Sequence, residues 1–232
     1  MTQDIELYHG KPLAEQVADH ILNYIIENGM ESGAKLPNEF ELAGQIGVGR
    51  GTIREAVKIL ASRNIVEIRR GAGTYVSERP GMVEDPLGLT FIRDKKNLAM
   101  ELLEVRLMLE PEIARMAAEH ATKEQTEALV KQCDKTEEMI RAGKNHMEDD
   151  VLLHEMIAAC SGNQVVAKLV PVINSSIAVF VDITNGQLRQ ETIETHREIV
   201  DAIVAGDGDG ARCAMNMHLL YNRRAILKTG ED

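Results

Sequence analysis

Two arginines four residues apart, followed at once by a short basic hairpin, constrain the fold of this chain more than any other feature. Arg50 and Arg54 would lie on one face of a helix, because residues four apart are neighbours on a helical surface. Apolar residues at helical spacing lie behind them. Two β-branched runs, at 65–68 and 74–76, are then joined by the basic, glycine-rich sequence Arg-Arg-Gly-Ala-Gly. This order predicts a helix that presents arginines to a DNA duplex, with a two-stranded wing behind it.

The residues before this pair supply the rest of such a domain. A helix is predicted from Leu13 to about Asn28, from apolar residues spaced by four. Asn38 is suited to the N-cap of a second helix, and Glu41, three residues later, completes a capping box. The third helix would run from about Gly51 to Ser62. Three helices and a hairpin within residues 1–78 predict a winged helix-turn-helix domain.

The rest of the chain has a different character. Residues 79–94 hold two prolines and two glycines and are predicted to be a linker. Residues 95–232 show helical periodicity and no clear strand pattern, so an all-α bundle of six or seven helices is expected. The predicted helices span residues 97–109, 111–120, 123–142, 147–160, 164–184, 188–205 and 209–227. The fold class is therefore expected to be mainly α.

Charge is distributed unevenly along the chain. The formal net charge is −11, which by itself argues against nucleic-acid binding. Residues 47–79, however, carry seven lysines and arginines against three glutamates, and the residues after them are strongly acidic. A charge run alone is usually a solvated surface. Next to the predicted helix and wing, it indicates a local surface for double-stranded DNA.

Composition indicates the cellular compartment. The sequence has no apolar run of 18 residues and does not open on a secretory leader, so neither a membrane span nor secretion is expected. Three cysteines, Cys133, Cys160 and Cys213, lie far apart and lack Cys-x-x-Cys spacing. They are typical of reduced thiols, and the expected location is the cytoplasm.

The second domain contains a chemically distinctive set of residues. Asp150 and His154 are four residues apart and would project from one side of a helix. His196 and His218 each lie on the apolar face of their own predicted helix. A single histidine on such a face is more often a hydrogen-bonded core residue, but three with a carboxylate predict a divalent metal site inside the bundle. Asp149 is expected to face solvent.

The spacing of these residues does not select one metal. Three imidazoles and a carboxylate suit Zn²⁺, Ni²⁺, Mn²⁺ or Fe²⁺, with Zn²⁺ as the first choice. Four protein ligands would leave one or two coordination positions open for a small molecule. A metal-dependent hydrolase or lyase would fit such a site, and so would a regulator with a purely structural metal. No general base is recognisable beside these residues, and an enzyme would not need the basic helix and wing.

Several segments together resemble a known family. Residues 36–39, 48–56 and 71–76 resemble the winged-helix signature of the GntR family of bacterial transcription regulators. The helical part is similar to the FadR-type ligand-sensing (FCD) domain in its metal-binding version, through residues 104–106, 109–110, 149–154, 195–199 and 217–218. The resemblance covers roughly Leu13 to Ile226.

This resemblance implies a homodimeric regulator, expected to be a repressor, that binds operator DNA and responds to a small carboxylate or sugar-acid effector. It implies DNA contacts at Lys35, Arg50, Thr52, Arg54, Arg70, Gly71 and Gly73. Phe40 departs from the family pattern, because an arginine often stands in that position.

Two side chains near the predicted sites have open roles. The resemblance implies that Arg106 pairs with the effector's carboxylate, whereas a helical ion pair with Glu110 at i+4 is an equal alternative. Glu55 is expected to be structural, either pairing with a base on the helix surface or orienting Arg54.

Overall fold

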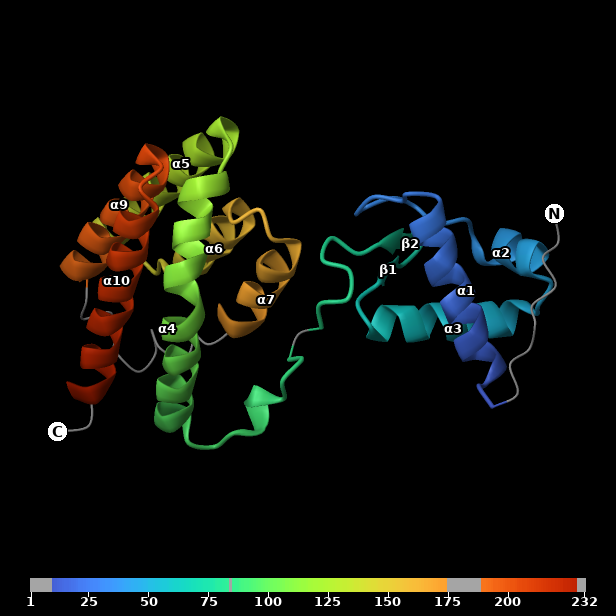
Figure 1. Cartoon of the computed structure of the whole chain (residues 1–232). Coiled ribbons are helices and arrows are strands. Elements are labelled where there is room, and N and C mark those ends of the chain that lie inside the picture. Colours follow the sequence, from blue (N-terminus) through green and yellow to red (C-terminus); the bar gives the residue numbers. More distant parts are fainter. Residues whose placement is uncertain (1–9, 84, 175–188, 229–232) are drawn as a thin grey trace. The chain divides into compact units, whose positions relative to one another are not determined.

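The computed structural model describes residues 10–83, 85–174 and 189–228. The chain divides into two compact units, Met1–Pro86 and Leu87–Asp232 (Figure 1). The division falls inside the predicted linker, which also holds a short 3-10 helix, η1 (Leu89–Phe91). The first linker residues are bonded to the N-terminal unit, because the side-chain amide of Asn64 donates to the carbonyl oxygens of Arg79 and Met82.

The N-terminal unit is a winged helix-turn-helix. Its helices are α1 (Leu13–Glu27), α2 (Glu39–Ile46) and α3 (Arg50–Ser62). Strands β1 (Val66–Arg69) and β2 (Gly73–Val76) form the antiparallel wing, with Val66 opposite Val76 and Arg69 opposite Gly73. The prediction of three helices followed by a hairpin is confirmed.

Local signals explain where α2 and α3 begin. The Asn38 side chain accepts hydrogen bonds from the backbone N–H groups of Phe40 and Glu41, and Glu41 accepts one from the Asn38 N–H, so the predicted capping box is present. Gly47 ends α2 with a φ of 77°, a left-handed conformation that suits glycine. Gly49 is the N-cap of α3.

One apolar core holds this unit together. Helix α1 packs against α3, and the wing closes over the end of α3. The fully or nearly fully buried side chains come from both helices and both strands: Val17, Ala18, Ile21, Ile53, Ala56, Leu60, Val66 and Val76. Because this core holds the inner face of α3, its outer face remains free for the arginines.

In the described part of the second unit, all regular secondary structure is helical. Its helices are α4 (Lys95–His120), α5 (Lys123–Arg141), α6 (Met147–Cys160), α7 (Gln164–Asn174), α9 (Arg189–Ala205) and α10 (Gly208–Lys228). Helix α4 packs along α10 and also contacts α6 and α9, while α5 packs on α6 and α9. No helix among the residues described is both long enough and apolar enough to span a bilayer.

Side-chain caps fix the starts of two helices in this unit. Thr122 and Gln125 form a capping box at the start of α5. The Asp207 carboxylate accepts a hydrogen bond from the Gly210 N–H at the start of α10.

The predicted break at Pro111 is wrong. Helix α4 continues through Pro111, although proline removes a backbone donor and crowds the preceding turn. The side chains on both sides of it, Glu110 and Ile113, are buried in the bundle. Packing along the whole length of α4 therefore outweighs the local penalty. Residues 175–188 lie outside the described part of the chain. They include the last residues of the helix predicted at 164–184 and the first residue of the helix predicted at 188–205.

Candidate functional site

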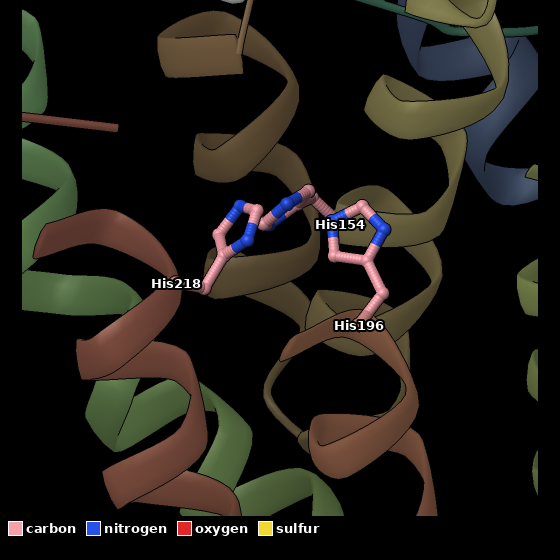
Figure 2. Close-up of side chains that lie close together, drawn as sticks. All are labelled: His154, His196 and His218. Carbon is pink, nitrogen blue, oxygen red and sulfur yellow. The ribbon is translucent and has the colours of Figure 1, made fainter. Parts of the chain in front are cut away.

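Three histidines from three helices meet inside the bundle. His154 lies on α6, His196 on α9 and His218 on α10, and each is 2% exposed. One ring nitrogen of each lies within 4.8 Å of one ring nitrogen of the others. Figure 2 shows the three rings turned toward one another. Their centroids lie 4.6 to 5.6 Å apart. The structure thus brings together three of the four residues that the sequence marked as metal ligands.

The fourth, Asp150, lies beside one of these histidines. Its Oδ1 atom is 3.2 Å from His196 Nε2, and it sits one helical turn before His154 on α6. The geometry at this distance is not that of a hydrogen bond, and His196 Nε2 is buried without a hydrogen-bond partner in the described structure. A buried nitrogen without a partner costs free energy unless something binds it.

The protonation state of the cluster suits a metal ion. Burial removes the hydration of the charged form of His196 and lowers its pKa to about 4, although Asp150 opposes this shift. Burial, together with the neighbouring His196 and His154, also holds the pKa of His218 well below its ordinary value. Neutral imidazole is the form that binds metal ions. Three converging imidazole rings, two of which burial holds neutral, a carboxylate and an unpartnered nitrogen therefore fit a divalent metal.

Glu110 adds a carboxylate that the sequence did not connect with this cluster. Its Oε2 atom lies 2.6 Å from His154 Nδ1, and its Oε1 atom lies 2.5 Å from Arg106 Nε. Burial would raise the pKa of Glu110, but the positive charge of Arg106 and the contact with His154 outweigh burial and hold it at about 2. Glu110 is therefore ionised at neutral pH.

Of the two roles expected for Arg106, the structure shows the ion pair with Glu110. Arg106 is 3% exposed and forms the i+4 ion pair with Glu110. Its Nη2 atom also lies 3.4 Å from each ring nitrogen of His154. The guanidinium group therefore lies at the edge of the histidine cluster.

His218 has two polar neighbours that sequence reasoning missed. Thr195 Oγ1 donates to the Glu191 carbonyl oxygen and lies 3.0 Å from His218 Nδ1, so it can accept a hydrogen bond from an Nδ1–H group. Asn222 Nδ2 lies 3.2 Å from His218 Nε2. The signal in the sequence was the i+4 spacing of Asn222 from His218, which places both on one helical face.

The expectation that Asp149 faces solvent is wrong. Asp149 is 9% exposed and lies against α5. Its Oδ1 atom pairs with Lys135 Nζ at 2.7 Å and accepts a hydrogen bond from Gln132. The hydrogen bond from Lys135 lowers the pKa of Asp149, so the negative charge of Asp149 pairs with Lys135 between α5 and α6. Packing of α5 against α6, which the helical periodicity of α6 alone does not reveal, accounts for this burial.

In the N-terminal unit, the predicted DNA contacts lie on α3 and in the wing. Arg50 and Arg54 are exposed, and Thr52 is half-buried. Arg54 forms a two-pronged ion pair with Glu39 at the start of α2, with Nη2 to Oε2 at 2.8 Å. Glu55 does not orient Arg54, because its carboxylate pairs with Lys58 instead.

The wing presents its basic side chains around one aromatic ring. Arg70 and Gly71 lie in the turn between β1 and β2. Arg69 Cζ lies 4.5 Å and Lys35 Nζ 5.7 Å from the centre of the Tyr75 ring. Gly73 has a φ of 125°, a backbone conformation that favours glycine, and a Cβ atom there would displace the end of the Lys35 side chain, whose Cε atom would lie 2.9 Å away.

Comparison with known proteins places both units in described families. Residues 13–76 match the family of bacterial regulatory proteins, gntR family, and residues 101–221 match the FCD domain. The solved structure of Streptococcus agalactiae GntR superposes with a TM-score of 0.80 at 44% identity, over 91% of this chain and 99% of that chain.

Curated relatives support the same assignment over nearly the whole length. The "Putative L-lactate dehydrogenase operon regulatory protein" of Escherichia coli K12 is 32% identical, over 95% of this chain and 88% of the relative. The "HTH-type transcriptional repressor NanR" of E. coli K12 is 30% identical, over 90% of this chain and 82% of the relative. The matched families and these relatives are transcription regulators rather than enzymes. The chain therefore belongs to the GntR family and is a DNA-binding transcription regulator with an FCD ligand-binding domain.

Proposed function

We propose that this regulator is a homodimeric repressor whose affinity for operator DNA is controlled by a small carboxylate effector bound at a metal ion. His154, His196, His218 and Asp150 would hold the metal, with Zn²⁺ as the first choice. The observation that carries the proposal is the convergence of three buried histidines, one of which has a ring nitrogen without a hydrogen-bond partner in the described structure. Burying a polar atom without a hydrogen bond costs free energy, so a purely structural role in the core does not account for this nitrogen.

When bound, the metal would supply a positive centre with open positions for a carboxylate or hydroxyl oxygen. Arg106 supports the choice of an anionic effector. Its guanidinium group lies beside His154 and adds a second positive charge at the edge of the cluster. Arg106 would pair with the effector's carboxylate while retaining its bond to Glu110.

The first effector to test is L-lactate. One relative is named as a regulator of an L-lactate dehydrogenase operon, and this chain is 32% identical to it. A 2-hydroxy acid offers a carboxylate and an adjacent hydroxyl group, which suit a metal ion with two open positions. Sugar acids and dicarboxylates carry similar groups and are the comparison compounds.

On the DNA side, α3 would enter the major groove and the wing would lie over the neighbouring backbone and minor groove. Arg50 and Arg54 are the candidate base-reading side chains, and Thr52 a contact to the backbone. Arg70, Gly71 and Gly73 of the wing would contribute, and so would Lys35, which lies before α2 and bridges to Tyr75 of the wing. Two copies would read two half-sites, so a change in the distance between their α3 helices would lower the affinity.

The test is a titration of labelled operator DNA, selected from a random pool with the Zn²⁺-loaded protein. We expect an effector to weaken binding by the wild type, and His196→Gln to bind the DNA without responding to it. His120→Gln, which changes an exposed histidine of α4, is the matched control and should respond like the wild type. A His196→Gln variant that keeps the full response contradicts the proposal. If Zn²⁺ stabilises the protein but no acid alters DNA binding, the metal is structural.

A further inference from the structure

One buried carboxylate joins the candidate metal ligand His154 to Arg106. Glu110 Oε2 lies 2.6 Å from His154 Nδ1 and 3.3 Å from Arg106 Nη2, while Oε1 lies 2.5 Å from Arg106 Nε. The side chains of Glu110, Arg106 and His154 are 5%, 4% and 1% exposed. Water therefore has little access to these bonds, and the three groups must satisfy one another.

This arrangement determines which nitrogen of His154 is available. An ionised carboxylate only accepts hydrogen bonds, so the atom that faces it on a neutral imidazole must carry the proton. The Nδ1 atom of His154 is then the donor, and Nε2 keeps the lone pair that a metal ion requires. In protein metal sites, an acceptor behind a ligating histidine fixes both the tautomer and the orientation of the ring.

Arg106 explains how a carboxylate can remain in this place. A buried carboxylate without a partner would be strongly destabilising, and two hydrogen bonds from a guanidinium group compensate its charge. The pair is four residues apart on α4, so the helix itself holds Arg106 and Glu110 in register.

We propose that Glu110 is a positioning residue, which holds His154 with Nε2 directed to the metal, and that Arg106 holds Glu110 in place. The inference rests on the proposed metal site but adds a residue that does not ligate the metal. It also distinguishes the histidines from one another. An uncharged hydroxyl group, that of Thr195, lies behind His218, whereas a carboxylate lies behind His154.

The first experiment needs neither a variant nor a metal. Nitrogen-15 NMR of the histidine rings in the chelator-treated wild type, at about pH 8, reports which ring nitrogen carries the proton. The proposal predicts His154 with the proton on Nδ1. A His154 ring with the proton on Nε2 would overturn it, because Nδ1 could not then donate to Glu110.

The second experiment measures Zn²⁺ affinity by competition with a chromophoric chelator. Glu110→Gln keeps the size of the side chain but loses the charge, and should weaken Zn²⁺ binding about 10–100-fold and change the His154 tautomer. Glu104→Gln makes the same change at an exposed position of α4 and should leave both unchanged. A Glu110→Gln variant that is folded and matches the wild type in affinity and tautomer overturns the inference alone.

Different results refute the proposed metal site and the proposed role of Glu110. A wild type that binds no Zn²⁺ at the three histidines refutes the proposed metal site, and with it the purpose given to Glu110. If Glu110→Gln does not fold, the tautomer of the wild type still decides whether Glu110 holds the ring.

Discussion

Mild acid should destabilise the metal-free protein at pH values above those at which the buried Glu110 takes up a proton. Burial lowers the pKa of His196 to about 4, so the folded protein resists taking up a proton that the unfolded chain accepts near pH 6.5. Such a group contributes stability above its unfolded pKa and loses it as the pH falls toward the folded value. Between about pH 7.5 and about pH 5.5, this shift removes about 1.3 kcal/mol from the free energy of unfolding. Burial also lowers the pKa of His218, which adds to the loss.

The titration of Glu110 falls below the range between about pH 7.5 and about pH 5.5, so it does not mask the effect of His196. Burial raises the pKa of Glu110, but Arg106 and His154 outweigh burial and hold it at about 2. In the unfolded chain the same carboxyl group titrates near its ordinary pKa of 4.5. The stability that Glu110 contributes is therefore complete above pH 4.5 and is lost only as the pH falls from there toward 2.

The assay is urea unfolding of the chelator-treated protein, followed by circular dichroism at both pH values. We expect the wild type to lose more than about 1 kcal/mol, and His196→Gln to lose about 1.3 kcal/mol less than the wild type. His120→Gln should keep the full loss. A wild type with constant stability across this range, or a His196→Gln variant that loses as much as the wild type, would refute the reasoning that the buried ring is held neutral.

Four further measurements test other parts of the structure. Arg54→Ala should weaken operator binding about 10-fold or more in fluorescence anisotropy, since one bidentate arginine–guanine contact is worth roughly 1–3 kcal/mol, and unchanged affinity would contradict the role of α3. Gly73→Ala should weaken operator binding without altering Zn²⁺ affinity, because φ is 125° and the added Cβ would meet Lys35. Operator binding equal to that of the wild type would contradict a DNA contact by the wing. Leu153→Ala should lower the free energy of unfolding by about 2–5 kcal/mol, because Leu153 is 0% exposed, and a loss well below 1 kcal/mol would contradict its place in the core. Free Zn²⁺ at 100 times its dissociation constant should raise that free energy by about 2.7 kcal/mol, reversibly with chelator, whereas no shift would argue against a site in the folded state.

The sequence predicted those features that short-range patterns control. The capping box at Asn38 lies where local chemistry places it. His196 and His218 were placed on buried faces by helical periodicity alone, and both are buried. Periodicity works here because a helix in a bundle has one inward face.

The features that sequence reasoning missed depend on contacts between segments far apart in the chain. Glu110 meets His154 across 44 residues, and Arg54 meets Glu39 across 15, so no single helical pattern shows either contact. Asp149 is buried because α5 covers it, and Pro111 is tolerated because α4 packs along its whole length. Tertiary packing overrode a local rule in both cases.

Anomalous diffraction at the zinc absorption edge, on crystals of the Zn²⁺-loaded protein, would locate the metal without reference to any variant. We predict one strong peak in each chain, within bonding distance of a ring nitrogen of His154, His196 and His218, with Glu110 still bonded to His154 Nδ1. A zinc ion bound elsewhere, with the three rings remaining metal-free, would contradict the proposed metal site.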